Sequence, residues 1–140
     1  MNHYKIQELA PGMEACFSVT ITEEMLKKFM EISGDVNPLH TDAAFAQAKG
    51  YPGRVAYGML TASLYSTLAG VYLPGEHCLL WEVNSKFTAP VFVGDELEVC
   101  GKVSEVNESY GFIRIKARIR NQKGKTVSRG VITAGVNDGT

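Results

Sequence analysis

The spacing of hydrophobic positions along the chain changes from a period of two to a helical period early in the sequence. Alternation of apolar and polar residues over residues 15–21 predicts a short strand. Residues 23–33 carry apolar side chains at helical spacing behind Thr22, whose hydroxyl is suited to cap a helix. Asp42 can cap a further short helix that reaches about Lys49. These patterns predict one strand and two helices before residue 50.

Residues 55–71 have the pattern of a long helix with almost no charge. Helical spacing places these apolar residues on one face: Val55, Met59, Leu60, Leu64, Leu68 and Val71. The remaining positions are mostly Ala, Ser, Thr, Tyr and Gly. Because no face of this helix is strongly polar, we expect it to be largely buried.

After Pro74 and Gly75 the period of two returns and continues through most of the remaining chain. Alternating stretches occur over residues 81–87, 97–103 and 113–119, and residues 126–136 form a last predicted strand. Strands with one apolar and one polar face are typical of an antiparallel sheet with one solvated side. We therefore expect a single α+β domain over residues 1–140, in which the sheet wraps around the long helix.

Composition excludes several classes of partner. Lys and Arg total 14 against 15 for Asp and Glu, so no excess of positive charge favours nucleic acid or an anionic membrane surface. The first residues lack the apolar run of a signal peptide, and no apolar stretch approaches the roughly 20 residues of a membrane span. The three cysteines are scattered, which predicts thiols in a reducing compartment, no disulfide framework and a cytoplasmic location.

The segment from residue 33 to residue 42 concentrates groups that can carry acid/base chemistry. Asp35, Asn37, His40 and Asp42 lie on a short irregular stretch between predicted helices. A carboxylate and an imidazole suit general acid/base catalysis, because the ordinary pKa of imidazole is about 6.5. Asp-x-Asn-Pro is also typical of a turn, and Asp42 is a good helix cap. The residue types alone leave a catalytic and a structural interpretation open.

A second candidate group is the backbone of Gly58, near the start of the predicted long helix. Helix N-termini present free N–H groups, which can stabilise a developing oxyanion. The alternative is that Gly58 only permits close packing of the helix on the sheet. No Gly-rich phosphate loop, Gly-x-Ser-x-Gly elbow or Cys/His pair with metal-ligand spacing occurs, and the adjacent His77 and Cys78 supply too few ligands for zinc.

The run 33–42, followed by residues 55–60, 86–87 and 89–95, resembles the MaoC-like (R)-specific enoyl-CoA hydratases, in order and over most of the chain. The resemblance implies a hot-dog fold, a homodimer or larger homo-oligomer, and a thioester substrate carried by CoA or acyl carrier protein. It implies that Asp35 and His40 form a catalytic dyad and that Gly58 supplies the oxyanion-hole N–H. It further implies that Ser66 orients the aspartate and that Asn37 lies beside the dyad.

One position departs from the pattern of these hydratases. They usually read Ala-His-Gly-Met where this chain has Tyr57, which is bulkier and does not titrate near neutral pH. Because Asp35, His40 and Gly58 are retained, the resemblance still implies reversible hydration of a trans-2-enoyl thioester to a (3R)-3-hydroxyacyl thioester. This reaction needs no metal or redox cofactor.

Two other functions remain open, namely an acyl-CoA thioesterase and a non-catalytic acyl-CoA-binding module. A thioesterase also needs a carboxylate or a group that positions water, whereas the Asn-Pro-Leu-His run favours hydration. A basic row at residues 114, 116, 118 and 120 has two interpretations as well. It is either a contact for CoA phosphates or the solvated face of a strand.

Overall fold

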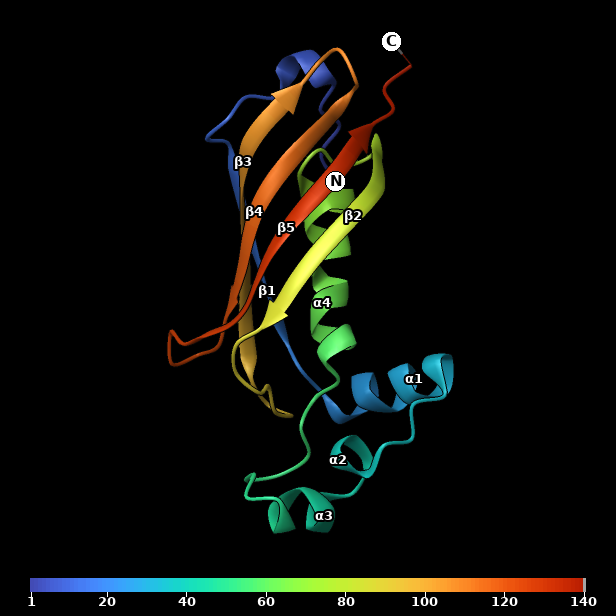
Figure 1. Ribbon diagram of the computed structural model, residues 1–140, viewed down its shortest axis with the longest axis vertical. Helices are drawn as coiled ribbons and strands as arrows, with labels where there is room; N and C mark the ends of the chain where they lie inside the picture. Colours follow the sequence, from blue (N-terminus) through green and yellow to red (C-terminus); the bar gives the residue numbers. More distant parts are fainter. Residues whose placement is uncertain (140) are drawn as a thin grey trace.

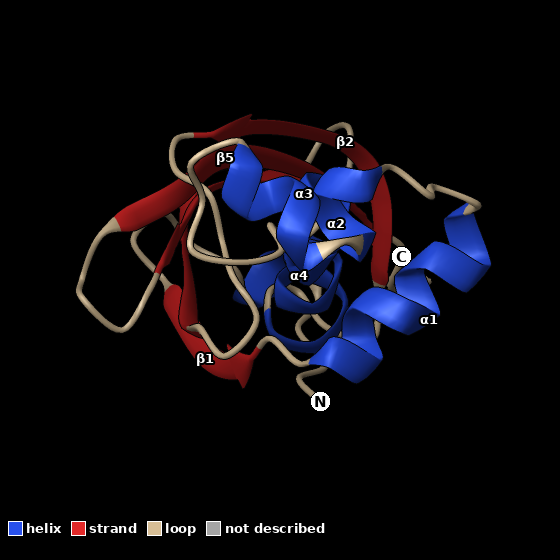
Figure 2. Ribbon diagram, turned by 90° about the horizontal axis from the view of Figure 1, so that it is seen from below, coloured by secondary structure: helices blue, strands red, loops and turns tan. Residues whose placement is uncertain are grey.

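The computed structural model describes residues 1–139 and shows an antiparallel sheet curved around a helix (Figures 1 and 2). The strands are β1 (Glu14–Thr20), β2 (Cys78–Phe87), β3 (Glu96–Asn107), β4 (Phe112–Arg120) and β5 (Thr126–Val136). The helices are η1 (Ile6–Glu8), α1 (Glu23–Ser33), α2 (Pro38–Thr41), α3 (Ala43–Ala48), α4 (Gly58–Thr67) and the π-helical turn η2 (Leu68–Tyr72). Within the described residues the strand order is β1-β3-β4-β5-β2, so β1 and β2 form the edges.

The core lies between the concave face of the sheet and α4. Strand β4 alternates as its sequence predicts, with Ile113, Ile115, Ala117 and Ile119 buried and Arg114, Lys116 and Arg118 exposed. A Cβ atom at Gly101 would lie only 2.7 Å from the Leu68 side chain, so this glycine lets the end of the helix approach β3 closely. The predicted α+β arrangement is confirmed.

The long helix begins later than the sequence predicts. Val55 and Ala56 are extended, because the Val55 N–H donates to the Leu39 carbonyl and the Ala56 N–H donates to the Val91 carbonyl. Helix α4 therefore starts at Gly58 and is continued by η2. Its buried positions include Thr61, Ala62 and Tyr65. Met59 was predicted on the buried face but is 65% exposed, so one side of this uncharged helix is uncovered in the single chain.

Three short helices cover the N-terminal end of α4, as Figure 2 shows from below. Helix α1 matches the predicted range, with Thr22 accepting a hydrogen bond from the Met25 N–H and Gly34 ending the helix at a φ of 73°. The turn predicted around Pro38 is the start of α2, because proline is well tolerated at the first helical position. The Asn37 side chain caps this turn by accepting from the Leu39 N–H.

Strand β2 contains an irregularity that the alternation of its sequence does not reveal. The register against β5 shifts between Leu80 and Glu82, and Trp81 lies over Gly135 and beside Phe112. The Trp81 ring therefore lies on the outer side of the sheet and does not alternate inward with Val83.

The prediction of three unpaired cysteines is wrong for two of them. Cys16 and Cys100 lie directly opposite each other in β1 and β3 and form a disulfide. Their 84-residue separation gives no sign of the strand register that pairs them. Among the described residues Cys78 remains a thiol, and burial raises its pKa. No helix of the described chain is long and apolar enough to span a membrane.

Candidate active site

Three of the predicted site residues, Asp35, His40 and Gly58, lie near the end of α4 that the three short helices cover. Asp35 lies in the loop between α1 and α2, His40 lies on α2, and Gly58 is the first residue of α4. Figure 1 shows α1 and α2 at the lower end of the molecule, beyond the end of the sheet and near the start of α4. The sheet and α4 support the site. Asp35 and His40 lie on segments that extend beyond them, and Gly58 lies where α4 begins.

His40 is half-buried and is held by a hydrogen bond to the main chain. Its Nδ1 lies 2.6 Å from the Val55 carbonyl oxygen. A carbonyl oxygen only accepts, so Nδ1 carries a proton in this arrangement and Nε2 is the nitrogen left for chemistry. The extended conformation of Val55, which the sequence did not predict, is what orients the imidazole.

Asp35 is exposed, and its loop is ordered by local hydrogen bonds. The Asp35 N–H donates to the Ser33 hydroxyl oxygen at 3.1 Å, and Asp35 Oδ1 accepts from the Asn37 N–H at 3.1 Å. The other carboxylate oxygen receives no hydrogen bond from residues 1–139 and is free to bind water. Asn37 beside it uses its side-chain oxygen as the cap of α2, so its visible role is to shape the loop.

Tyr57 connects Asp35 and His40. This side chain is only 2% exposed, and its hydroxyl donates to the Asp35 carbonyl oxygen at 2.7 Å. Its ring lies 4.2 Å from the His40 ring and 4.8 Å from the Phe29 ring, measured between centroids. Burial raises the pKa of Tyr57, and the Asp35 charge adds to this effect against that of Arg54. The hydroxyl therefore remains a donor at physiological pH.

His40 and Gly58 line one open cleft of about 430 Å³. Most of its remaining wall is apolar and comes from residues around the end of β2, including Phe87, Ala89 and Val91. A helix leaves its first N–H groups without internal partners, so the Gly58 N–H is available to a ligand here. A Cβ atom at Gly58 would already lie 3.4 Å from the Phe87 ring, which leaves little room for a side chain.

Ser66 lies apart from these groups. It is exposed on α4 and lines a separate apolar cleft with Met59, Leu80 and Phe87, at the edge formed by β2. No hydrogen bond joins Ser66 to Asp35 within residues 1–139. The predicted role of Ser66 in orienting Asp35 therefore stays a prediction.

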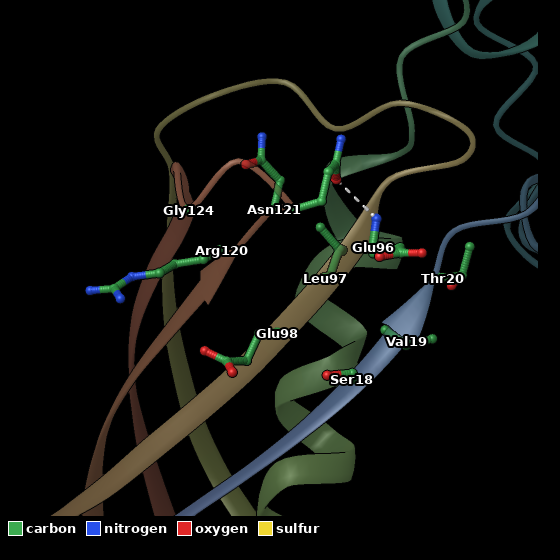
Figure 3. Close-up of a pocket in the computed structure, with 10 residues that line it drawn as sticks. Ser18, Val19, Thr20, Glu96, Leu97, Glu98, Arg120, Asn121 and Gly124 are labelled. Carbon is green, nitrogen blue, oxygen red and sulfur yellow. Dashed lines mark hydrogen bonds between the residues drawn. The ribbon is translucent and has the colours of Figure 1, made fainter.

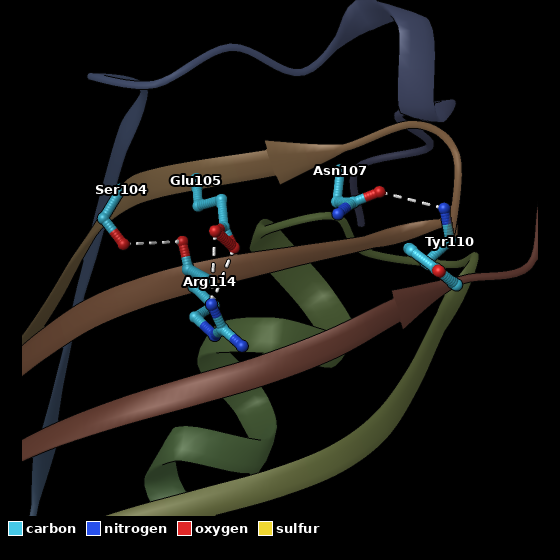
Figure 4. A network of polar contacts seen from close by, with 5 residues as sticks. All are labelled: Ser104, Glu105, Asn107, Tyr110 and Arg114. Carbon is cyan, nitrogen blue, oxygen red and sulfur yellow. Dashed lines mark hydrogen bonds and ion pairs between the residues drawn. The ribbon is translucent and has the colours of Figure 1, made fainter.

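Other polar features of the surface do not contribute to this site. A cleft of about 460 Å³ beside the turn that follows β4 is lined by residues such as Glu98, Arg120 and Asn121, and Asp35, His40 and Gly58 are not among its lining residues (Figure 3). On the outer face of β4, Arg114 pairs with Glu105 at 2.7 Å (Figure 4). Arg114, Lys116 and Arg118 of the basic row are exposed on this face, whereas Arg120 is half-buried. Contact of this row with CoA phosphates stays a prediction. The described residues contain no group of three or more His, Cys, Asp or Glu suited to a metal ion.

Comparison with known proteins reveals a consistent set of relatives. The profile of the family described as MaoC like domain matches residues 7–133. An (R)-specific enoyl-CoA hydratase of Aeromonas caviae is 36% identical over 118 residues, which cover 84% of this chain and 88% of that protein. An (R)-specific enoyl-CoA hydratase of Rhodospirillum rubrum is 31% identical over 131 residues, with coverage of 94% and 90%.

Similar solved structures include two R-hydratases. The R-hydratase PhaJ1 from Pseudomonas aeruginosa superimposes with a TM-score of 0.89 at 34% identity, over 96% of this chain and 86% of that chain. The (R)-hydratase from A. caviae involved in PHA biosynthesis also gives a TM-score of 0.89, at 33% identity and with coverage of 93% and 98%. The hot-dog fold expected from the sequence is therefore confirmed.

Substitution of Tyr57 tests its hydrogen bond to the Asp35 carbonyl. Tyr57→Phe keeps the ring contacts and removes the hydrogen bond to the Asp35 carbonyl. We expect the free energy of unfolding to fall by about 1 kcal/mol, the usual net value of one hydrogen bond, and amide exchange to accelerate in residues 35–39. Urea unfolding and hydrogen-exchange mass spectrometry measure the two effects. Tyr110→Phe, at a side chain that is 78% exposed, is the control. Unchanged exchange in residues 35–39 would contradict the assigned bond.

Proposed function

Because the chain belongs to the MaoC-like family, we propose that it catalyses the reversible hydration of a trans-2-enoyl-CoA to a (3R)-3-hydroxyacyl-CoA. The observation that carries this proposal is the cleft lined by both His40 and Gly58, the first residue of α4. The relatives that match most of the chain are named (R)-specific enoyl-CoA hydratases, which supports CoA as the carrier. A mitochondrial dehydratase named for acyl carrier protein matches only 54% of this chain.

In the proposed mechanism, His40 Nε2 and the free Asp35 oxygen hold one water molecule. The water oxygen attacks C3 of the enoyl thioester while one of these two groups removes its proton. Negative charge then develops on the thioester oxygen, where the Gly58 N–H stabilises it. A proton returns to C2, so the product contains the atoms of one added water. Since both groups approach from one side of the substrate, the addition is syn. The reaction moves only water and protons and calls for no redox or metal cofactor.

Thioester hydrolysis is the competing reaction at this site, and non-catalytic binding of acyl-CoA is the third function to separate. Crotonyl-CoA distinguishes all three, because hydration removes its conjugated double bond and hydrolysis releases a thiol. Loss of the enoyl absorbance without thiol release is the expected result. Thiol release would indicate a thioesterase, and the absence of both changes would indicate a binding module.

Substitution of each acid/base group tests the mechanism directly. Asp35→Asn and His40→Gln are each expected to lower turnover of crotonyl-CoA by about 10²–10⁴-fold, the usual effect of removing a general acid or base. Both positions are exposed or half-buried, so the variants should fold, and circular dichroism checks this. Near-normal turnover by either folded variant would remove that residue from the mechanism.

We further propose that two copies of the chain form a homodimer through the β2 edge and the uncovered side of α4. Large apolar side chains are exposed there, including Met59 at 65%, Phe87 at 51% and Leu80 at 40%. Natural proteins rarely leave an apolar sheet edge uncovered. A partner at this surface would also enclose the exposed end of the site, where water exclusion strengthens the electrostatic contacts. As separate proposals, we infer a higher oligomer built from such dimers and a cytoplasmic location.

Sedimentation analysis tests the dimer. We expect twice the mass of one chain at micromolar concentration, and we expect Leu80→Lys to shift the protein towards the single-chain mass by placing a charge in the apolar contact. Glu98→Lys, at an exposed polar position of the interior strand β3, is the control outside the proposed contact. Wild-type protein that sediments only as a single chain would contradict the proposal.

A further inference from the structure

A buried hydroxyl on α4 lacks a hydrogen-bond partner. Thr61 is 2% exposed, and its Oγ1 atom is buried without a partner among the described residues. Two other hydroxyls of this helix have partners: Ser63 donates to the Leu60 carbonyl, and the buried Tyr65 hydroxyl pairs with Ser128 at 2.7 Å. Buried polar groups without partners are costly and uncommon, so a partner for Thr61 is expected to enter from outside the chain.

The position of Thr61 indicates where this partner binds. Thr61 lines the same cleft as His40 and Gly58. It follows Gly58 by three residues, about 4.5 Å along the helix axis, and helical side chains lean towards the N-terminus. The Thr61 side chain therefore projects over the first turn of α4, where the Gly58 N–H is free. The other threonine of this cleft, Thr88, already donates to the Thr126 carbonyl at 2.9 Å.

The chemistry of the proposed substrate limits what the hydroxyl can contact. In the reacting half of an enoyl thioester, the double bond and alkyl chain form no strong hydrogen bonds, and the carbonyl oxygen is the one strong acceptor. The attacking water is held by Asp35 and His40 in the proposed mechanism. A carbonyl oxygen has two lone pairs and accepts two donors at once. A hydroxyl beside the first turn of α4 is therefore placed to share that oxygen with the Gly58 N–H.

We infer that the Thr61 hydroxyl is a second donor to the thioester oxygen, so that Thr61 and Gly58 together form the oxyanion hole. This inference rests on the proposed function. Thr61 forms no covalent bond and keeps its proton throughout. Its hydrogen bond strengthens as the oxygen gains charge and weakens again when C2 is protonated. Because such a contact is strongest in the transition state, Thr61 contributes to kcat more than to KM.

Isosteric substitution separates this role from a structural one. Thr61→Val preserves the shape of the side chain and removes the hydroxyl, whereas Thr61→Ser keeps the donor. With crotonyl-CoA, we expect the Val variant to lose about 10²-fold in kcat, as for other oxyanion donors, with little change in KM, and the Ser variant to retain most of the activity. Ser63→Ala, which removes a satisfied hydroxyl from the same helix, should leave kcat unchanged.

Thermal stability of the ligand-free variants gives an independent readout. Replacing an unsatisfied buried hydroxyl by a methyl group should leave the melting temperature of Thr61→Val unchanged or higher. A clear fall in melting temperature together with normal kcat would mean that the hydroxyl has a structural partner, and would overturn the inference. A rise in KM with unchanged kcat would also overturn it, because the contact would then not strengthen in the transition state.

The carbonyl stretch of a bound thioester reports on the same contact without turnover. We expect isotope-edited infrared spectra of (3R)-3-hydroxybutyryl-CoA, labelled with ¹³C at the thioester carbonyl, to show a lower frequency on wild-type protein than on Thr61→Val. Equal frequencies, with wild-type protein that hydrates crotonyl-CoA, would refute the role of Thr61 and leave the proposed function intact. Wild-type protein that does not hydrate crotonyl-CoA would refute the function, while the difference in frequency would still decide whether Thr61 contacts the carbonyl.

Discussion

The arrangement of the site depends on the buried side chain of Tyr57. Its hydroxyl fixes the main chain at Asp35, its ring supports the face of His40, and its backbone immediately precedes the first residue of α4. One residue therefore sets the positions of the carboxylate, the imidazole and the helix N-terminus relative to one another. The ordinary pKa of a tyrosine hydroxyl is about 10, and burial raises the pKa of Tyr57 further, so this hydrogen bond persists across the physiological pH range.

Tyr57 matters because the Asp35 loop and α2, which it joins, contribute no residue to the main core. The curved sheet and α4 bury their apolar side chains against each other, and Leu26 of α1 joins this core, whereas α2 and α3 extend beyond the end of the sheet (Figure 1). Some of their attachments contribute little stability, such as the Arg54–Glu23 ion pair, in which the Glu23 side chain is 77% exposed. Directed contacts such as the Tyr57 hydroxyl and the Val55–His40 hydrogen bond therefore determine the geometry of the site.

Local sequence patterns correctly predict those strands and helices whose structure depends on residues close together in the chain. The alternation in β4 and the capped helix at residues 23–33 agree with the structure, because side-chain period and cap chemistry act within a few residues. The start of α4 was misplaced, since Val55 and Ala56 are held in extended form by carbonyl groups distant in sequence. The Cys16–Cys100 pairing depends in the same way on strand register, which no local pattern encodes.

In the candidate site, too, the sequence identifies some residues and only the folded structure reveals the others. Residue types and spacing single out Asp35, His40 and Gly58, and the structure places His40 and Gly58 in one cleft. The sequence marked Tyr57 as unusual but gave no sign of its bond to Asp35, which requires the loop and the helix to be folded together. Thr61 was missed altogether, because an unsatisfied hydroxyl can be recognised only when every neighbouring acceptor is known.

A crystal structure with bound (3R)-3-hydroxybutyryl-CoA would test the central claim most directly, through the positions of two ligand oxygens. The account predicts that the C3 hydroxyl lies within hydrogen-bond distance of His40 Nε2 and the Asp35 carboxylate. It also predicts a separation of about 2.7–3.1 Å between the Gly58 nitrogen and the thioester oxygen, the usual range for oxyanion donors. A thioester oxygen that points away from Gly58, or a C3 hydroxyl out of reach of both His40 and Asp35, would contradict it.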